Sequence, residues 1–346
     1  MRLIKPNTKF DFVGRRYIAF SVSGLLILIS IISLLFHGGL NYGIDFLGGS
    51  ILQLKFDTAV EISQIKAGLE SADISKSTVQ TFGEVKNNEY LIRTDTPVTA
   101  NQEFTDKLEQ SLKSTTGQIA EIRRVEIVGP KVGKELQNKA LLAIFYSLLF
   151  LAIYISGRFE LKWMASGIIA AALMGVVYFF SVFKINMVII TGVALLVTFI
   201  FFWLMDLKYA MAAIVALVHD VIITVGMFSL FNKEFNLPIV AAILAIIGYS
   251  LNDTIIIFDR IRENLKKNRK ISLTGIINKS VNETLSRTFL TSGLTLVVVI
   301  ALFALGGGII HDFAFALLVG IIIGTYSSIY VASPILIAWT GKRKKK

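Results

Sequence analysis

Eight apolar runs, each close to the ~20 residues that a helix needs to cross a lipid bilayer, constrain this sequence more than any other feature. Hydrophobic residues make up 54% of the 346 positions and charged residues only 17%, against about a quarter charged in a soluble domain. Because lipid offers no hydrogen bonds, each run must pair its backbone within its own helix. We therefore expect a polytopic α-helical membrane protein with about eight spans, at residues 17–36, 140–157, 163–183, 185–205, 209–231, 237–258, 288–305 and 313–339.

Lysines and arginines in the short loops indicate the orientation of the spans. They gather in the N-terminal segment, the turns at 158–162 and 208, the loop 260–270 and the tail 342–346. Both ends of the chain are therefore expected in the cytoplasm. The formal charge of +11 is explained by positive charges that keep these loops in the cytoplasm, rather than by binding of nucleic acid. The first span is expected to be uncleaved, because Phe36-His37 is not a small-residue cleavage site.

One sizeable segment, 38–138, is expected outside the membrane. Its apolar patterns predict the order βαββαβ and thus a small ferredoxin-like α+β domain. The expected domains are the N-terminal segment with the first span (1–37), the outer domain (38–138), a bundle of seven helices (139–340) and a basic tail (341–346). Residues 271–286 have one apolar helical face, which suits either a helix in the membrane interface or a helix packed on the bundle.

Composition excludes several kinds of chemistry. The chain has no cysteine, so disulfides, thiolate metal sites and cysteine nucleophiles are ruled out. It has three histidines and no HExxH pattern. We expect no enzyme activity, no resident cofactor and no metal.

Two helical hairpins of the bundle resemble each other. The sequence 160–170 is similar to the sequence 206–216, which predicts a duplicated hairpin over 140–183 and 185–231. Chance similarity between two apolar hairpins is the alternative. The second copy carries Asp220 where the first carries Met174.

Asp220 is the most informative single residue, because it lies in the middle of an apolar span. An ionised aspartate at that depth costs roughly 2.5–3.5 kcal/mol. Desolvation favours the neutral acid, so a carboxyl that takes up a cation on one side and releases it on the other can couple ion flow to a change of shape. The alternative is a permanently neutral acid that only bonds a neighbouring helix. The adjacent His219 is expected to pack rather than to relay protons, because it points about 100° away on the helix.

A second polar group lies in the next spans. Asp253 is inside the cytoplasmic boundary, and Arg260, two turns later, lies on the same helical face. Interfacial anchoring is the alternative for Arg260. Hydroxyl and amide side chains beside Asp253 and in the seventh span predict a supporting polar seam shared with Asp220, for which close helix packing is an equal explanation. Its members are Asn252, Thr254, Thr291 and Ser292.

Glycines and a proline mark the two junctions between the outer domain and the membrane. Gly48 and Gly49 permit positive φ before the first outer strand, and Asp45 can brace that turn. Gly129 and Pro130 mark the return to the membrane. These five residues are predicted to form a hinge or joint.

Six motifs, in order along nearly the whole chain, resemble the SecD/SecF family of protein-export membrane proteins, in the resistance-nodulation-division superfamily. The motifs lie at 43–49, 128–133, 216–221, 247–254, 258–264 and 324–332. The resemblance implies a bacterial inner-membrane subunit with a periplasmic domain. It also implies use of the proton-motive force, or of sodium, to help the Sec machinery move unfolded polypeptides. By position, Asp220 matches the intramembrane acid of the family. Asp253 and Arg260 match its polar helix, so the resemblance implies that they also take part in ion coupling.

The partners that the resemblance implies are SecD, the SecYEG channel, the translocating polypeptide and membrane lipid, with YajC and YidC as further candidates. Family members usually have six spans, whereas here an additional hairpin precedes Asp220. Two other functions remain open: an exporter of lipids or small molecules on the same scaffold, and a translocon scaffold without ion flow. A larger outer domain and a twin-half chain would fit the exporter better.

Overall fold

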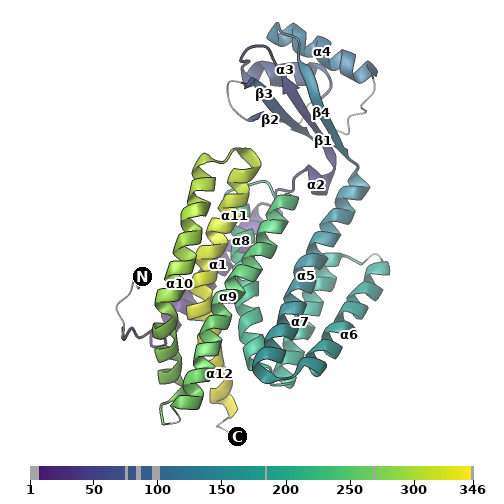
Figure 1. Cartoon of the computed structure of the whole chain (residues 1–346). Coiled ribbons are helices and arrows are strands. Elements are labelled where there is room, and N and C mark those ends of the chain that lie inside the picture. Colours follow the sequence, from purple (N-terminus) through teal and green to yellow (C-terminus); the bar gives the residue numbers. More distant parts are fainter. Residues whose placement is uncertain are drawn as a thin grey trace.

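The computed structural model describes residues 8–74, 77–82, 87–95, 102–183, 185–268 and 270–343. A bundle of long helices carries a small domain of strands and short helices at one end (Figure 1). The described residues contain eight helices that are long and apolar enough to cross a membrane, which confirms the predicted fold class. Residues 344–346 of the expected basic tail lie outside the described residues.

The spans follow the apolar runs closely, and the last one passes through a short π-helical segment. The bounds are α1 (Arg16–Phe36), α5 (Pro130–Glu160), α6 (Trp163–Val182), α7 (Met187–Leu204), α8 (Lys208–Leu230), α9 (Leu237–Lys267), α10 (Leu273–Leu305), and α11 (Gly308–Ser327) with η2 (Ser328–Ala332) and α12 (Ser333–Arg343).

Three spans extend beyond their apolar runs. Helix α5 begins at Pro130, α9 continues to Lys267 and α10 begins at Leu273. The expectation of a separate element at 271–286 is therefore wrong, since most of this segment is the first part of α10. Its apolar face packs on the bundle, because Ile277 and Val281 belong to the main core.

The outer domain has the expected order of strands and helices. Its elements are α2 (Ile44–Leu47), β1 (Gly49–Lys55), α3 (Ile62–Ser71), β2 (Ser77–Phe82), β3 (Glu89–Thr94), α4 (Gln102–Thr116) and β4 (Glu121–Val128). The sheet order is β2-β3-β1-β4 and all neighbours are antiparallel. Leu52 pairs with Ile92 of β3 and with Val125 of β4. The apolar faces of α3 and α4 contribute Leu69 and Leu108 to a core with these central strands.

The bundle has a central part and an edge. Helices α8 and α9 carry most of the main core, whereas α6 and α7 lie beside α5 at the edge of the bundle (Figure 1). The edge helices share a smaller core with α5, in which Phe145 meets Leu173 and Ile190. The additional hairpin is thus attached to the central bundle on one side.

The two basic turns of the predicted duplication contact each other. Tyr209 of α8 donates its backbone N–H to Glu160 Oε1 over 2.9 Å, and Lys162 Nζ donates to the carbonyl of Met205 over 2.6 Å. The left-handed residue is Leu161 in the first turn and Asp206 in the second. The two turns therefore differ by one position in the aligned sequences, and the duplication stays a prediction.

Candidate functional site

Asp220 lies near the middle of α8, the most deeply packed span. Of the most apolar stretch of α8, 67% is buried inside the protein, the largest share among the eight spans. The Asp220 side chain is 1% exposed. Small residues allow the close packing around it, as at Gly226, where an added Cβ would lie 2.1 Å from Ser30 of α1.

Hydroxyl groups from two neighbouring helices converge on the Asp220 carboxyl. Ser250 of α9 donates to Oδ2 over 2.6 Å, and Ser327 of α11 donates to the same oxygen over 2.8 Å. Ser327 is followed directly by the π-helical segment, a local widening of the helix that is frequent at functional sites. One carboxyl therefore joins α8, α9 and α11 in the centre of the bundle.

His219 contacts the other oxygen of the carboxyl, contrary to our expectation of a packing role. Its Nδ1 lies 2.9 Å from Asp220 Oδ1, and its Nε2 lies 3.0 Å from Ser23 Oγ of α1. Adjacent side chains diverge by 100° on a helix, but Nδ1 is close enough to the backbone to reach its neighbour. Ser23 Oγ is 3.2 Å from the Tyr326 hydroxyl, which donates to the Ala19 carbonyl. A chain of polar groups thus runs from Asp220 to α1.

The polar groups at Ser23 and His219 border a groove on the surface of the bundle. A groove of about 410 Å³ lies among α1, α8 and η2, and Ser23 and His219 line it together with apolar side chains. The His219 side of the carboxyl is therefore separated from this largely apolar groove by two polar side chains, those of His219 and Ser23.

Asp253 has a separate polar group beside the first. Ser292 of α10 donates to Asp253 Oδ2 over 3.2 Å and accepts from Thr325 of α11 over 2.9 Å. Thr325 and Ser327 are two residues apart, so α11 contacts the environments of both acids. Asp253 is 2% exposed.

The other predicted seam residues divide between the interior and the surface. Thr254 and Thr291 turn their hydroxyls back to carbonyls of their own helices, those of Ser250 and Arg287. Asn252 is exposed on the outer face of α9. Of the predicted seam, Ser292 contacts a buried acid.

Arg260 lies away from both buried acids, in the extension of α9. Its Nε donates to Glu283 of α10 over 2.7 Å and its Nη1 donates to Glu263 over 2.8 Å. The structure therefore places Arg260 in a partly exposed ion-pair group with two glutamates, and it does not bring Arg260 to Asp253.

The predicted joint residues meet where the outer domain joins the bundle. Gly48 has φ +84°, and an added Cβ would lie 2.8 Å from the backbone of Pro130. Gly49 has φ +140°, and its added Cβ would lie 2.2 Å from the Thr94 carbonyl oxygen. Gly129 and Pro130 are the N-cap and the first residue of α5. Asp45 Oδ2 accepts the backbone N–H of Leu237, at the start of α9, over 2.9 Å.

The same region holds an ion pair between the outer domain and the bundle. Arg93 of β3 lies 2.5 Å from Glu234, in the loop between α8 and α9. The backbone of this loop is also tied to the segment before α2, because Gly43 donates to the Phe235 carbonyl over 2.8 Å. We call the Arg93–Glu234 ion pair the domain latch. It connects the outer domain to the loop that directly follows the helix of Asp220.

The residues that sequence reasoning missed are hydroxyl groups inside apolar spans. Ser23, Ser327 and Tyr326 were not singled out, and Ser250 was noted only as a polar neighbour of Asp253, yet all four surround Asp220 and His219 from three other helices. A weak signal was present in α11, where Gly320, Gly324 and Ser327 recur on one helical face. Within the described ranges, no group of three or more histidines and acids could hold a metal ion.

Comparison with protein families finds two matching models. The model described as "Protein export membrane protein SecD/SecF, C-terminal" matches residues 107–200 and 183–342. The "SecD/SecF GG Motif" model matches residues 33–60, which include Gly48 and Gly49.

Curated relatives match the chain from end to end. A protein translocase subunit SecF from Calditerrivibrio nitroreducens is 41% identical and covers 100% of this chain and 99% of its own. The subunit of the same name from Magnetococcus marinus is also 41% identical, over 100% of this chain and 97% of its own. The subunit of the same name from Vibrio alginolyticus is 38% identical, over 96% of this chain and 90% of its own.

Solved structures of SecDF share the arrangement. The crystal structure of SecDF from Thermus thermophilus, a translocon-associated membrane protein, has a TM-score of 0.72 and 31% identity over 99% of this chain. SecDF in its super-membrane-facing form has a TM-score of 0.64 and 32% identity over 100% of this chain. This chain spans 40% of the length of each SecDF chain.

Proposed function

The chain belongs to the SecD/SecF family of protein-export membrane proteins, and from this premise we propose that it works with SecD to couple the proton-motive force to late translocation of unfolded polypeptides. As a family member with eight spans, it is a multi-pass protein of the bacterial inner membrane and a transport subunit, not an enzyme. Besides SecD, the proposed partners are SecYEG and the translocating polypeptide, with YajC and YidC as further candidates.

The buried carboxyl of Asp220 carries the coupling proposal. It is held by hydroxyls from α9 and α11 and by the His219 ring, so a change in its charge alters contacts of four helices at once when Ser23 of α1 is included. A membrane potential supplies about 2.3 kcal/mol per charge per 100 mV. That energy shifts a two-state equilibrium roughly fifty-fold, since ~1.4 kcal/mol is tenfold. Sodium is the alternative ion.

A stripe of small residues with one amide on α9 supports pairing with SecD. Ala241, Ala245, Gly248 and Asn252 are all exposed and lie on one face of this span. Small residues permit close approach of another helix, and an amide in hydrocarbon gains by finding a partner. The solved SecDF chains are longer than this chain and contain matching helices together with further sequence, which fits a partner of the SecD type.

The test is preprotein export into inverted membrane vesicles that contain SecD and the Asp220→Asn variant. We expect normal insertion but loss of the stimulation by a proton gradient. Asp57→Asn, at an exposed position of the outer domain, is the matched control and should keep full stimulation. Full stimulation in the Asp220 variant would reject coupling through this residue. Equal export with and without an uncoupler in the unmodified protein would favour a scaffold, and stimulation by a sodium gradient alone would identify sodium as the ion.

A further inference from the structure

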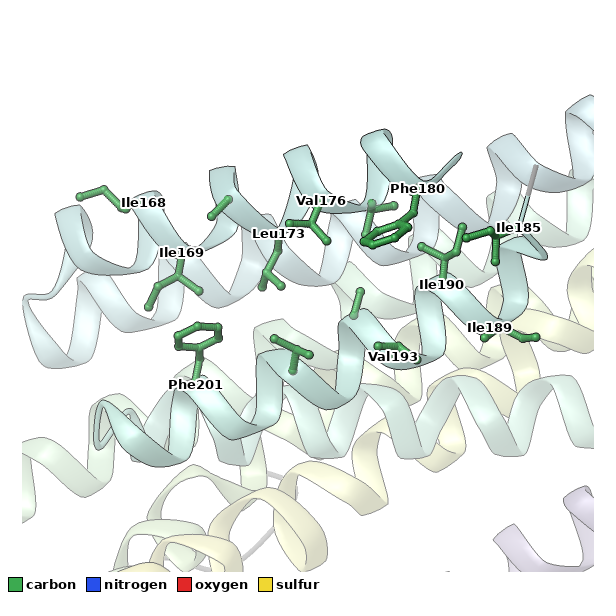
Figure 2. A pocket seen from close by; sticks show the side chains of 14 residues that line it. Ile168, Ile169, Leu173, Val176, Phe180, Ile185, Ile189, Ile190, Val193 and Phe201 are labelled. Atoms are coloured by element: carbon green, nitrogen blue, oxygen red, sulfur yellow. The ribbon is translucent and has the colours of Figure 1, made fainter. Parts of the chain in front are cut away.

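A wholly apolar groove of about 590 Å³ runs between α6 and α7. Isoleucine, leucine, valine, alanine and phenylalanine side chains line it. Figure 2 shows Ile169 and Leu173 from one helix and Val193 and Phe201 from the other pointing into the space between them. The groove is open to the outside of the bundle, because Val193 remains 57% exposed.

The position of the groove determines what can fill it. Both α6 and α7 are candidate membrane spans, so the groove opens toward hydrocarbon and not toward water. Acyl chains already surround such a surface, and burial of apolar area gives little driving force there. When the groove is unfilled, however, the side chains that line it lose dispersion contacts on the open side. An acyl chain that lies along the groove restores these contacts.

The lining and the volume favour a hydrocarbon chain over a protein helix. Close packing of membrane helices uses small residues at the contact, whereas this groove is lined mainly by long or β-branched side chains. The groove volume lies in the ~300–1,000 Å³ range of sites for small ligands, which suits a single acyl chain.

Charge and aromatic groups mark the cytoplasmic end of the groove. Lys162, just before α6, donates to the Met205 carbonyl, just after α7, and so places a cation between the two helix ends. An ammonium has three N–H donors, and basic groups between spans on the cytoplasmic side bind lipid head groups. Trp163 and Trp203 lie at the same ends of α6 and α7, 50% and 54% exposed, as aromatic residues do at the level of lipid head groups, and they pack on Tyr154 of α5 and Trp339 of α12.

We infer that the groove between α6 and α7 binds one phospholipid of the membrane, with an acyl chain along the groove and the phosphate beside Lys162. The bound lipid would fill the space between the two helices of the additional hairpin and cover the outer side of the core that the hairpin shares with α5, because Leu173 and Ile190 belong to both. This inference does not depend on ion coupling at Asp220.

The first test compares two substitutions on the same helix. Ala172 lines the groove, whereas the adjacent Ala171 is also exposed but does not line it. The full-length protein and its Ala172→Phe and Ala171→Phe variants are purified, delipidated and titrated with palmitoyl-oleoyl phosphatidylglycerol, and bound lipid is counted by native mass spectrometry. We expect one tightly bound lipid, at least fivefold weaker binding in the Ala172 variant, and unchanged binding in the Ala171 variant. Equal binding by all three proteins, or none by the unmodified protein, overturns the inference.

A second measurement does not rely on folding of the Ala172 variant. A photoreactive amino acid at Val193 is activated in intact membranes that contain SecD, and the adduct is identified by mass. A phospholipid adduct supports the inference. An adduct to SecD, to another polypeptide or to a second copy of this chain overturns it, as does the absence of any adduct.

Discussion

Replacing Arg93 with glutamine removes the cation from the domain latch while keeping a polar side chain of similar length. The latch connects the sheet of the outer domain to the loop between α8 and α9, over 2.5 Å. We expect Arg93→Gln to raise the population of molecules in which the outer domain has left this loop, because the remaining backbone contacts hold the segment before α2 and not the sheet itself.

The expected size of the effect follows from the burial of the pair. The Arg93 and Glu234 side chains are 11% and 24% exposed. Fully exposed pairs contribute about 0.2–1 kcal/mol, whereas breaking a buried pair costs about 3–5 kcal/mol. An intermediate value of about 1–2 kcal/mol changes the ratio of docked to undocked molecules by roughly 5- to 30-fold.

Pulsed electron paramagnetic resonance can measure this change directly. The chain has no cysteine, so Ser71→Cys in the outer domain and Leu305→Cys at the end of α10 would carry the only spin labels. Both positions are exposed. We expect one narrow distance distribution in the otherwise unmodified protein and a second, broader population in the Arg93 variant.

Two further variants decide whether the ion pair itself is responsible. Lys107→Gln removes an exposed ion pair with Asp73 inside the outer domain, whose side chains are 51% and 86% exposed, and it should leave the distances unchanged. The exchange of charges in Arg93→Glu with Glu234→Arg should restore part of the docked population. Identical distance distributions in Arg93→Gln and the unmodified protein would refute the reasoning.

Two glycine substitutions give further predictions. Gly49→Ala should destabilise the outer domain by about 1–3 kcal/mol, because the glycine has φ +140° and its added Cβ would meet a carbonyl oxygen. Faster hydrogen exchange of the strands would show this effect. The control Gly129→Ala, with open space around its added Cβ, should leave the exchange unchanged. Gly324→Leu should displace Ser250, which would lie 2.8 Å from the added Cβ, and should therefore lower gradient-stimulated export. The control Gly293→Leu, whose added Cβ meets open space, should leave this export unchanged. Unchanged exchange in the first case, or unchanged export with normal insertion in the second, would contradict these predictions.

The sequence predicts the spans well because the requirement for apolar side chains in lipid is local. It fails where a helix continues into water, because polar helices and polar loops have the same low hydropathy. The segment that begins α10 illustrates this, since its apolar face suggested a separate helix, either in the membrane interface or packed on the bundle. Its polar face carries Asn278 and Asn282. In the structure they bind the N-terminal segment, where Asn278 Oδ1 accepts the backbone N–H of Phe12 over 2.8 Å.

The site was only partly predictable for a related reason. Asp220 is evident because a lone acid in an apolar run is costly wherever the helix lies. The hydroxyls of Ser250 and Ser327 are not costly in a span, since a hydroxyl can bond a carbonyl of its own helix, and they give no signal until the helices are packed. Arg260 shares a helical face with Asp253, but it pairs with Glu283 because α9 and α10 both extend beyond the apolar runs and lie side by side there.

Helix α5 runs without interruption from the last strand of the outer domain to the turn at Leu161. Its 31 residues form a rod about 46 Å long at ~1.5 Å per residue. A rod of this kind behaves as a lever, so a rotation of only ~5° at the outer joint would move its far end by about 4 Å. A tilt of the outer domain that carries α5 with it would therefore displace the end of this helix at the opposite face of the membrane. The hydrogen bonds within the helix could stay intact.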